Sequence, residues 1–249
     1  SANICIYGVG RSGTKIVQAA LCMGLARKYG ACDINYEPLY WADRKCRIVS
    51  EPGSNEHKRL PLFIDADMAA TLDSEYIRMK TIPRDDIPVV TKFIRGNGRI
   101  RLIHKLAKPD KTIFVFRSLI GVLNSLRHCE FDLLGKGQQY ATDHPQLLKA
   151  IGRSRELPLT VSFIDRIVTS EDRNALWWLA INESAISALE DIRSSGNPVF
   201  VLDYNYLAAQ ARKSYAALCD FINIESADIP VELVSNNLLR DETWLQTLE

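Results

Sequence analysis

Short apolar runs separated by helical patterns dominate the profile of hydrophobic and polar positions along this chain. The runs cover residues 4–7, 89–94, 112–116 and 199–202. Runs of this length without strict alternation are typical of strands buried on both faces of a sheet. Because strands that alternate with helices form parallel sheets, the pattern predicts an α/β fold with a P-loop-like central parallel sheet and helices on both faces.

Two segments carry the clearest helical spacing. Residues 14–29 place apolar side chains such as Val17, Leu21 and Leu25 at helical intervals, directly after a glycine-rich turn. Residues 171–193 predict one long amphipathic helix, with Ser170 as its N-cap and the Gly-Asn-Pro sequence at 196–198 as its stop.

The size of the chain fits one domain. With 249 residues, of which 47% are hydrophobic and 24% charged, it can bury one substantial core, and we expect a single domain over residues 1–249. No uninterrupted apolar run reaches the roughly 18 residues of a membrane span. The six cysteines form no CxxC pair and no zinc-site spacing, which fits reduced thiols in a cytoplasmic protein.

The net charge of +1 conceals a basic stretch. Between residues 78 and 127, twelve Lys and Arg residues face only three acidic ones, Asp85, Asp86 and Asp110. Such a surplus suits an anionic ligand. The alternative is a set of solvated helix faces. Binding of nucleic acid is not expected, because aromatic residues do not interleave with the basic ones as they do in single-strand binders.

A glycine-rich turn follows the first apolar run, and we call its residues 10–15 the phosphate loop. After a buried strand, such glycines let backbone amides converge on an anion at the N-terminus of the next helix. The same pattern also fits a plain strand-helix connection. The expected anion-binding residues are Gly10, Arg11, Ser12, Gly13, Thr14 and Lys15.

A nucleotide-hydrolysing P-loop is the obvious competitor for this turn. Its pattern places Lys and then Ser or Thr directly after the last glycine, where they reach the β- and γ-phosphates and hold magnesium. Here Gly13 is followed by Thr14 and then Lys15, so the order is inverted. A kinase or NTPase acting on a small molecule is therefore the alternative to the function favoured below.

The sequence Arg11-Ser12-Gly13-Thr14 resembles the 5′-phosphosulfate loop of sulfotransferases that use 3′-phosphoadenosine 5′-phosphosulfate (PAPS), closest to the carbohydrate and tyrosylprotein branches and bacterial relatives. The family holds the 3′-phosphate with an Arg at a strand end and a Ser eight positions later. Arg117 and Ser125 have this spacing. The chain departs from the family in having Ser118-Leu119 where Asp-Pro or similar is usual.

The Glu-Pro-Leu sequence at 37–39 resembles the segment after the first helix in carbohydrate sulfotransferases, which implies that Glu37 is the general base. A structural ion pair of Glu37 with Arg44 or Arg47 is the alternative, and His57 or His104 are other candidate bases. The late strand and its Leu202-Asp203 end also resemble the family, although they fit a Walker-B-like strand equally well.

The resemblance implies transfer of a sulfuryl group from PAPS to an acceptor hydroxyl or amine, with adenosine 3′,5′-bisphosphate (PAP) as product and no metal. Arg11 is then expected to stabilise the leaving group, and Lys92 to approach the transferred group or be a surface lysine. The segment 128–170 either covers the acceptor site or connects elements. Trp177 and Trp178 either stack on adenine or fill the core. The acceptor, a carbohydrate, a lipid or a small metabolite, and the oligomeric state stay open.

Overall fold

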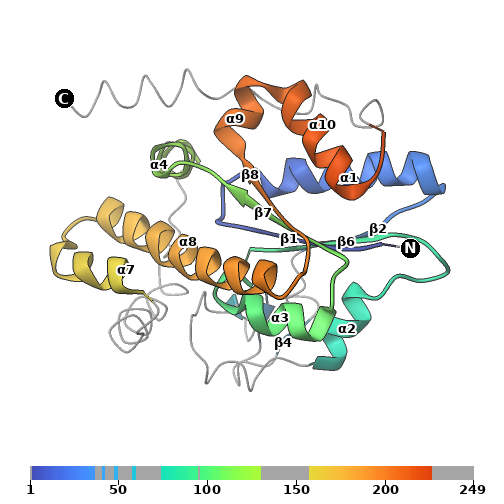
Figure 1. Cartoon of the computed structure of the whole chain (residues 1–249). Coiled ribbons are helices and arrows are strands. Elements are labelled where there is room, and N and C mark those ends of the chain that lie inside the picture. Colours follow the sequence, from blue (N-terminus) through green and yellow to red (C-terminus); the bar gives the residue numbers. More distant parts are fainter. Residues whose placement is uncertain are drawn as a thin grey trace.

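The computed structural model describes residues 2–36, 41–42, 48–49, 58–59, 74–94, 96–129 and 157–225. Its centre is a five-stranded sheet in the order β2-β6-β1-β7-β8 (Figure 1). All four neighbouring pairs are parallel, so the carboxyl ends of the five strands lie at one edge. The strands are β1 (Asn3–Gly8), β2 (Asp33–Tyr36), β6 (Val89–Phe93), β7 (Lys111–Phe116) and β8 (Val199–Asp203).

Helices cover both faces of this sheet (Figure 1). One face carries α1 (Thr14–Tyr29), α9 (Tyr204–Ala209) and α10 (Ala211–Ile222), and the other carries α2 (Ser74–Thr81), α3 (Ile100–Ala107) and α8 (Ser170–Ser194). Successive residues of a strand point to opposite faces. Accordingly, Ile4 and Ile6 pack in the core beneath α1 and α10, whereas Cys5 and Tyr7 pack beneath α3 and α8. The α/β fold expected from the sequence is confirmed.

A third apolar cluster lies beyond the carboxyl edge of the sheet. It joins α4 (Leu119–His128), α7 (Pro158–Phe163) and the first half of α8 through residues that include Val122, Leu157 and Trp177. The Glu183 carboxylate on α8 accepts hydrogen bonds from the backbone amides of Leu159 and Thr160 at the start of α7. Trp177 is fully buried in this cluster, so its core alternative is the correct one.

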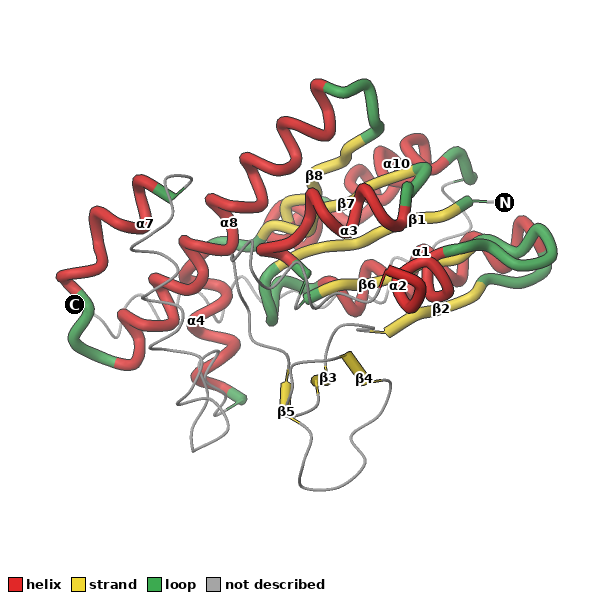
Figure 2. The backbone as a smooth tube through the Cα atoms, turned by 90° about the horizontal axis from the view of Figure 1, so that it is seen from below, coloured by secondary structure: helices red, strands yellow, loops and turns green. Residues whose placement is uncertain are grey.

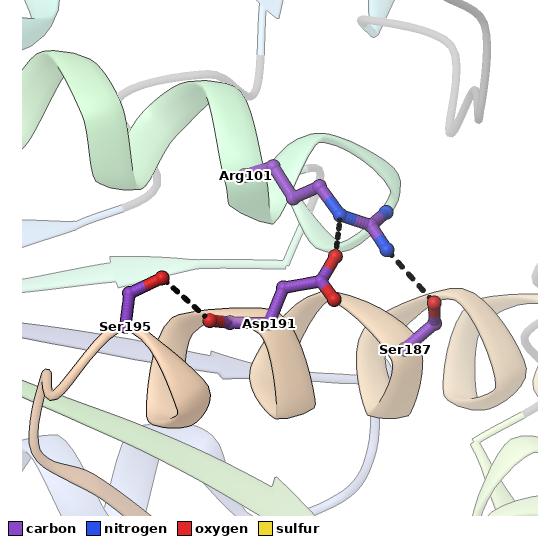
Figure 3. Close-up of polar contacts among 4 residues, drawn as sticks. All are labelled: Arg101, Ser187, Asp191 and Ser195. Atoms are coloured by element: carbon purple, nitrogen blue, oxygen red, sulfur yellow. Dashed lines mark hydrogen bonds and ion pairs between the residues drawn. The ribbon is translucent and has the colours of Figure 1, made fainter.

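On the face of the sheet that α2, α3 and α8 cover, polar contacts hold α3 to α8 (Figure 3). Arg101 on α3 donates from Nε to Asp191 Oδ2 at 2.6 Å and from Nη2 to Ser187 Oγ at 2.8 Å. The side chains of Arg101 and Asp191 are 40% and 63% exposed, so this pair contributes at most about 1 kcal/mol. Two single-turn 3₁₀ helices, η2 (Asn97–Arg99) and η3 (Ile164–Arg166), complete these layers.

The start of α8 corrects one sequence prediction. The N-cap is Thr169 and not Ser170: the Thr169 Oγ1 accepts from the Asp172 amide at 3.1 Å, and Asp172 Oδ2 accepts from the Thr169 amide at 2.7 Å. Such a reciprocal capping box satisfies two helix-terminal donors at once. The acidic residue three positions after Thr169 is the signal that selects it.

The predicted strands and the helix 14–29 are confirmed, whereas β2 and the small antiparallel sheet β4-β3-β5 were not predicted. That sheet consists of β3 (Trp41–Ala42), β4 (Ile48–Val49) and β5 (Lys58–Arg59), and Figure 2 shows it beside the five strands. Glu37, His57 and residues 130–156 of the segment 128–170 lie outside the described residues. None of the helices described is long and apolar enough to cross a bilayer.

Candidate functional site

The phosphate loop connects β1 to α1 at the carboxyl edge of the sheet, and all six of its predicted residues lie there. Gly8 begins the turn, and a Cβ at this position would lie 2.6 Å from the Val115 carbonyl oxygen on β7. Gly13 has a φ of +90°, and a Cβ there would lie 2.2 Å from the ring of Tyr204. Close approach therefore requires glycine at position 8, and close approach together with a left-handed backbone requires it at position 13.

The N-terminus of α1 opens onto this loop. Gly13 is the N-cap, and because it has no side chain the helix lacks a side-chain cap. Its carbonyl accepts from the amides of Ile16 at 3.1 Å and Val17 at 3.2 Å. No side chain of the described residues therefore occupies the N-terminus of α1, and the partial positive charge of this helix end favours an anion.

Ser12 presents a second feature that fits an anion site. Its side chain is only 1% exposed, and within the described part of the chain its hydroxyl has no hydrogen-bond partner. A buried hydroxyl without a partner costs about 1–3 kcal/mol, so native structures keep few of them. An anion held by the loop is a suitable acceptor for this donor.

Arg117 follows β7 directly and reaches the phosphate loop. Its Nη1 donates to the Arg11 carbonyl oxygen at 3.0 Å, and its guanidinium lies 5.2 Å from the centre of the Tyr204 ring. The indole nitrogen of Trp178 donates to the Arg117 carbonyl at 2.9 Å. Arg117 is 5% exposed, so its charge is fixed in a buried position beside the loop.

Ser125 lies on α4, one helix further along the chain. It accepts a hydrogen bond of 3.1 Å from Nε of Arg11. Ser118 caps α4 by accepting from the Gly121 amide at 3.2 Å, and it also accepts from the Asn205 side-chain amide at 3.0 Å. The structure thus brings Arg11, Arg117 and Ser125 together at one edge of the sheet.

Lys92 lies on β6, one residue before the end of the strand, and it is 2% exposed. The surface-lysine alternative is therefore wrong. In the sheet Lys92 lies beside Ile6 of β1 and Tyr36 of β2. In the loop, Thr14 is buried, whereas Lys15 is exposed at the start of α1.

His104 is placed away from the loop. Its side chain lies near Asn197, which precedes β8 at the amino-terminal edge of the sheet, opposite the loop. Burial is the main influence on this imidazole and lowers its pKa below the ordinary value. His104 is consequently not a base for chemistry at the carboxyl edge.

Two residues of the site were missed by sequence reasoning. Asn97, which is 1% exposed, accepts from the Gly8 amide at 2.9 Å and donates to the carbonyl oxygens of Gly8 and Ile94, both at 2.7 Å. Tyr204 has its ring against Gly13 and beneath Arg117. Tyr204 directly follows the predicted late strand, where a tyrosine is also an ordinary packing residue, and no local pattern marks Asn97.

The site of this α/β protein lies at the carboxyl edge of a parallel sheet. It consists of the N-terminal end of a helix, a buried hydroxyl and a buried positive charge. Ligands of open parallel sheets commonly bind at this edge. Among the described residues no three His, Cys, Asp or Glu side chains gather as a metal-binding group.

Several solved structures are similar to this chain, and two sulfotransferases are among them. No protein-family model matches the chain, and no curated protein matches it. A sulfotransferase from Alicyclobacillus acidocaldarius is similar at 13% identity with a TM-score of 0.46, over 92% of this chain and 84% of that one. A mouse sulfotransferase complexed with PAP is similar at 13% identity with a TM-score of 0.43, over 90% of this chain and 59% of the mouse chain. Likeness at this level carries no argument about function, which rests on the site's own residues.

Proposed function

We propose that this protein is a PAPS-dependent sulfotransferase, on the observation that its two predicted anion sites touch each other. Arg117 Nη1 lies 3.0 Å from the Arg11 carbonyl oxygen, and Arg11 Nε lies 3.1 Å from Ser125 Oγ. PAPS carries its 5′-phosphosulfate and its 3′-phosphate on one ribose, so a protein that binds both must hold two anion sites side by side. Sites on different faces of the sheet would have excluded this donor.

Each anion site has the chemistry for one end of the donor. The amides of residues 13–15, the Ser12 hydroxyl and the Lys15 cation at the start of α1 would hold the 5′-phosphosulfate, while the Ser12 amide donates to the Val9 carbonyl. The guanidinium of Arg117 supplies charge and paired donors for the 3′-phosphate, and the Ser125 hydroxyl supplies a directed hydrogen bond. The donor leaves as PAP after transfer.

The proposed reaction is an in-line displacement at sulfur. The acceptor oxygen or nitrogen forms a bond to sulfur while the bond from sulfur to the bridging oxygen of the 5′-phosphate breaks, and its electron pair leaves with PAP. The acceptor proton passes to Glu37, the proposed base. Positioning and electrostatic stabilisation dominate transfers of this kind, by analogy with phosphoryl transfer. The sulfuryl group carries one negative charge, which lessens the need for a metal.

The buried Lys92 is a second proposed contact of the transferred group, because β6 ends one residue later at the same edge of the sheet. Segment 128–170 is proposed to cover the acceptor. The acceptor is a carbohydrate, a lipid or a small metabolite, in a cytoplasmic setting.

A kinase or NTPase is the second candidate, and the loop disfavours it. In a P-loop the lysine and the hydroxyl that follow the last glycine face the nucleotide and its magnesium ion. Here the first residue of α1 is a buried threonine, and the lysine that follows is exposed. The lysine that should reach the phosphates and the hydroxyl that should hold magnesium are therefore exchanged in position.

A thermal-shift comparison of PAP with ATP plus magnesium tests the proposal. A ligand at about 100 times its Kd adds about 2.7 kcal/mol of stability, which is several degrees in Tm for a chain of this size. We expect this shift with PAP, a smaller one with ADP, and the smallest with ATP plus magnesium. A larger shift with ATP plus magnesium than with PAP would replace the proposed function with the kinase or NTPase.

A further inference from the structure

The side chain of Arg11 points to a different part of the site from the one its sequence position indicates. The loop pattern assigns it to the leaving 5′-phosphate. In the structure its Nε donates to Ser125 Oγ at 3.1 Å and its Nη2 donates to Cys129 Sγ at 3.0 Å. Both partners belong to the last part of α4, Cys129 being its C-cap. The guanidinium therefore lies against α4.

The backbone of the loop accounts for this direction. Arg11 has a φ of 71°, in the left-handed region that non-glycine residues rarely adopt. Its carbonyl oxygen is held by Arg117 Nη1 at 3.0 Å. The loop thus has an unfavourable backbone conformation at Arg11. The carbonyl oxygen of Arg11 contacts Arg117, and its guanidinium contacts Ser125.

The partners of this guanidinium leave its charge uncompensated. Within the described residues they are one hydroxyl and one thiol, and no carboxylate. The Ser125 hydroxyl accepts from Arg11 and keeps its own proton to donate. A charged fork beside a free hydroxyl proton suits a tetrahedral anion that accepts from both.

We propose that Arg11 is a third ligand of the 3′-phosphate, together with Arg117 and Ser125, and that it determines specificity for 3′-phosphorylated adenosine nucleotides. This inference rests on the proposed function and changes the end of the donor that Arg11 serves. With the Arg11 guanidinium at the 3′-phosphate, the 5′-phosphosulfate of the donor is held by the amides at the start of α1 and by Lys15. Arg11 then governs which nucleotide binds.

Isothermal titration with PAP and with AMP tests this assignment, because the two ligands differ only in the 3′-phosphate. For Arg11→Gln we expect PAP affinity to fall about 10- to 100-fold, the usual weight of hydrogen bonds to charged groups. AMP affinity should stay within about threefold, which would also show that the loop is folded. The preference for PAP over AMP therefore shrinks.

A matched control and a second variant sharpen the test. Arg127→Gln removes the same charge from an exposed position on α4 and should leave both affinities within about twofold. Arg11→Lys keeps the charge and loses the fork, and it should lose PAP affinity by less than Arg11→Gln does. In a double-mutant cycle, Arg11→Gln and Ser125→Ala should be non-additive for PAP, because both groups bind one phosphate.

Three results would overturn the inference. Equal losses of PAP and AMP affinity in folded Arg11→Gln or Arg11→Lys would return Arg11 to the 5′ end. Unchanged PAP affinity would remove it from the site. A wild-type protein that binds AMP as tightly as PAP would remove the proposed function itself, and this inference with it.

Discussion

Arg117, the residue after β7, donates from Nη1 to the carbonyl oxygen of Arg11, the second residue of the phosphate loop, at 3.0 Å. This contact crosses the carboxyl edge of the sheet between neighbouring strands β1 and β7. It fixes the loop with a buried charge, so one guanidinium serves both the loop conformation and the proposed 3′-phosphate site. Substitutions of Arg117 will therefore change stability and nucleotide binding together.

Arg117→Ala should weaken binding of PAP at least 30-fold while ADP affinity falls less than about fivefold, because only PAP carries a 3′-phosphate. The loss of the hydrogen bond to Arg11 and of the contact with Tyr204 should also lower the free energy of unfolding by about 1–3 kcal/mol. Titration calorimetry and urea unfolding measure the two effects. Equal losses for PAP and ADP would argue against a 3′-phosphate site at Arg117.

Asn97→Leu should lower the free energy of unfolding by about 2–4 kcal/mol, because the buried Gly8 amide and two carbonyls lose their partner. Asn97→Asp should also destabilise, since a carboxylate keeps the Gly8 amide but turns an acceptor towards two carbonyl oxygens. Lys105→Ala, at an exposed position of the neighbouring α3, is the control and should change stability by less than 0.5 kcal/mol, roughly. Wild-type stability of Asn97→Leu would contradict the role of this side chain.

Gly13→Ala and Gly30→Ala form a matched pair. Both glycines have a positive φ, but a Cβ at Gly30 would meet nothing within 4 Å, whereas one at Gly13 would lie 2.2 Å from the Tyr204 ring. Gly30→Ala should cost about 1 kcal/mol, the cost of the left-handed backbone. Gly13→Ala should cost at least about 2 kcal/mol more and abolish measurable PAP binding. Similar destabilisation of the two variants in urea unfolding would show that Tyr204 can move aside.

The capping box of α8 predicts a pH dependence. The amides of Thr169 and Val168 and the Thr169 hydroxyl hold the pKa of Asp172 below its ordinary value, the Thr169 amide most strongly. Because the folded pKa is the lower one, this stability is present above the unfolded pKa and is lost as pH falls through the folded pKa. Solvent screens this exposed carboxylate, so Asp172→Asn should cost at most about 1 kcal/mol at pH 7 and less near pH 3. A cost that does not shrink in acid urea unfolding would exclude this ionisation.

Glu37→Gln tests the proposed base. Turnover should fall at least 100-fold, since general-base catalysis commonly contributes about that much. PAP affinity should stay within about twofold, because the proposal places Glu37 on the acceptor and not on the nucleotide. Single-turnover transfer from PAPS measures the first and calorimetry the second. Retained turnover would remove Glu37 from the mechanism.

The sequence predicted those parts of the fold that local patterns determine. Apolar runs located the strands that lie inside the sheet, and the spacing of glycines located the loop after β1. The edge strand β2 escaped because its Asp33-Ile34-Asn35-Tyr36 sequence has a single aliphatic residue, and that residue is half-exposed. A strand with one neighbour needs no continuous apolar run.

Part of the candidate site depends on contacts between distant residues, which no local pattern contains. Asn97 contacts Gly8 across 89 positions of sequence. β6 ends at Phe93, which pairs with Tyr7, so it has no residue to pair with Gly8. The Asn97 side chain makes those hydrogen bonds to Gly8 instead. The spacing of Arg117 and Ser125 was readable because both lie in one strand-helix unit, whereas the direction of the Arg11 side chain required the folded chain.

The side-chain amide of Asn97 also restricts movement of the carboxyl edge of the sheet. Two hydrogen bonds tie Asn97, in the turn after β6, to Gly8, the last residue of β1, and a third joins Asn97 to Ile94 within that turn. On the α4 side, Arg11 holds Ser125 and Cys129 only by hydrogen bonds of an exposed side chain. The loop is thus fixed firmly on the β6 side of the sheet edge and more loosely on the α4 side, so any adjustment to a ligand should fall on the Arg11 side chain.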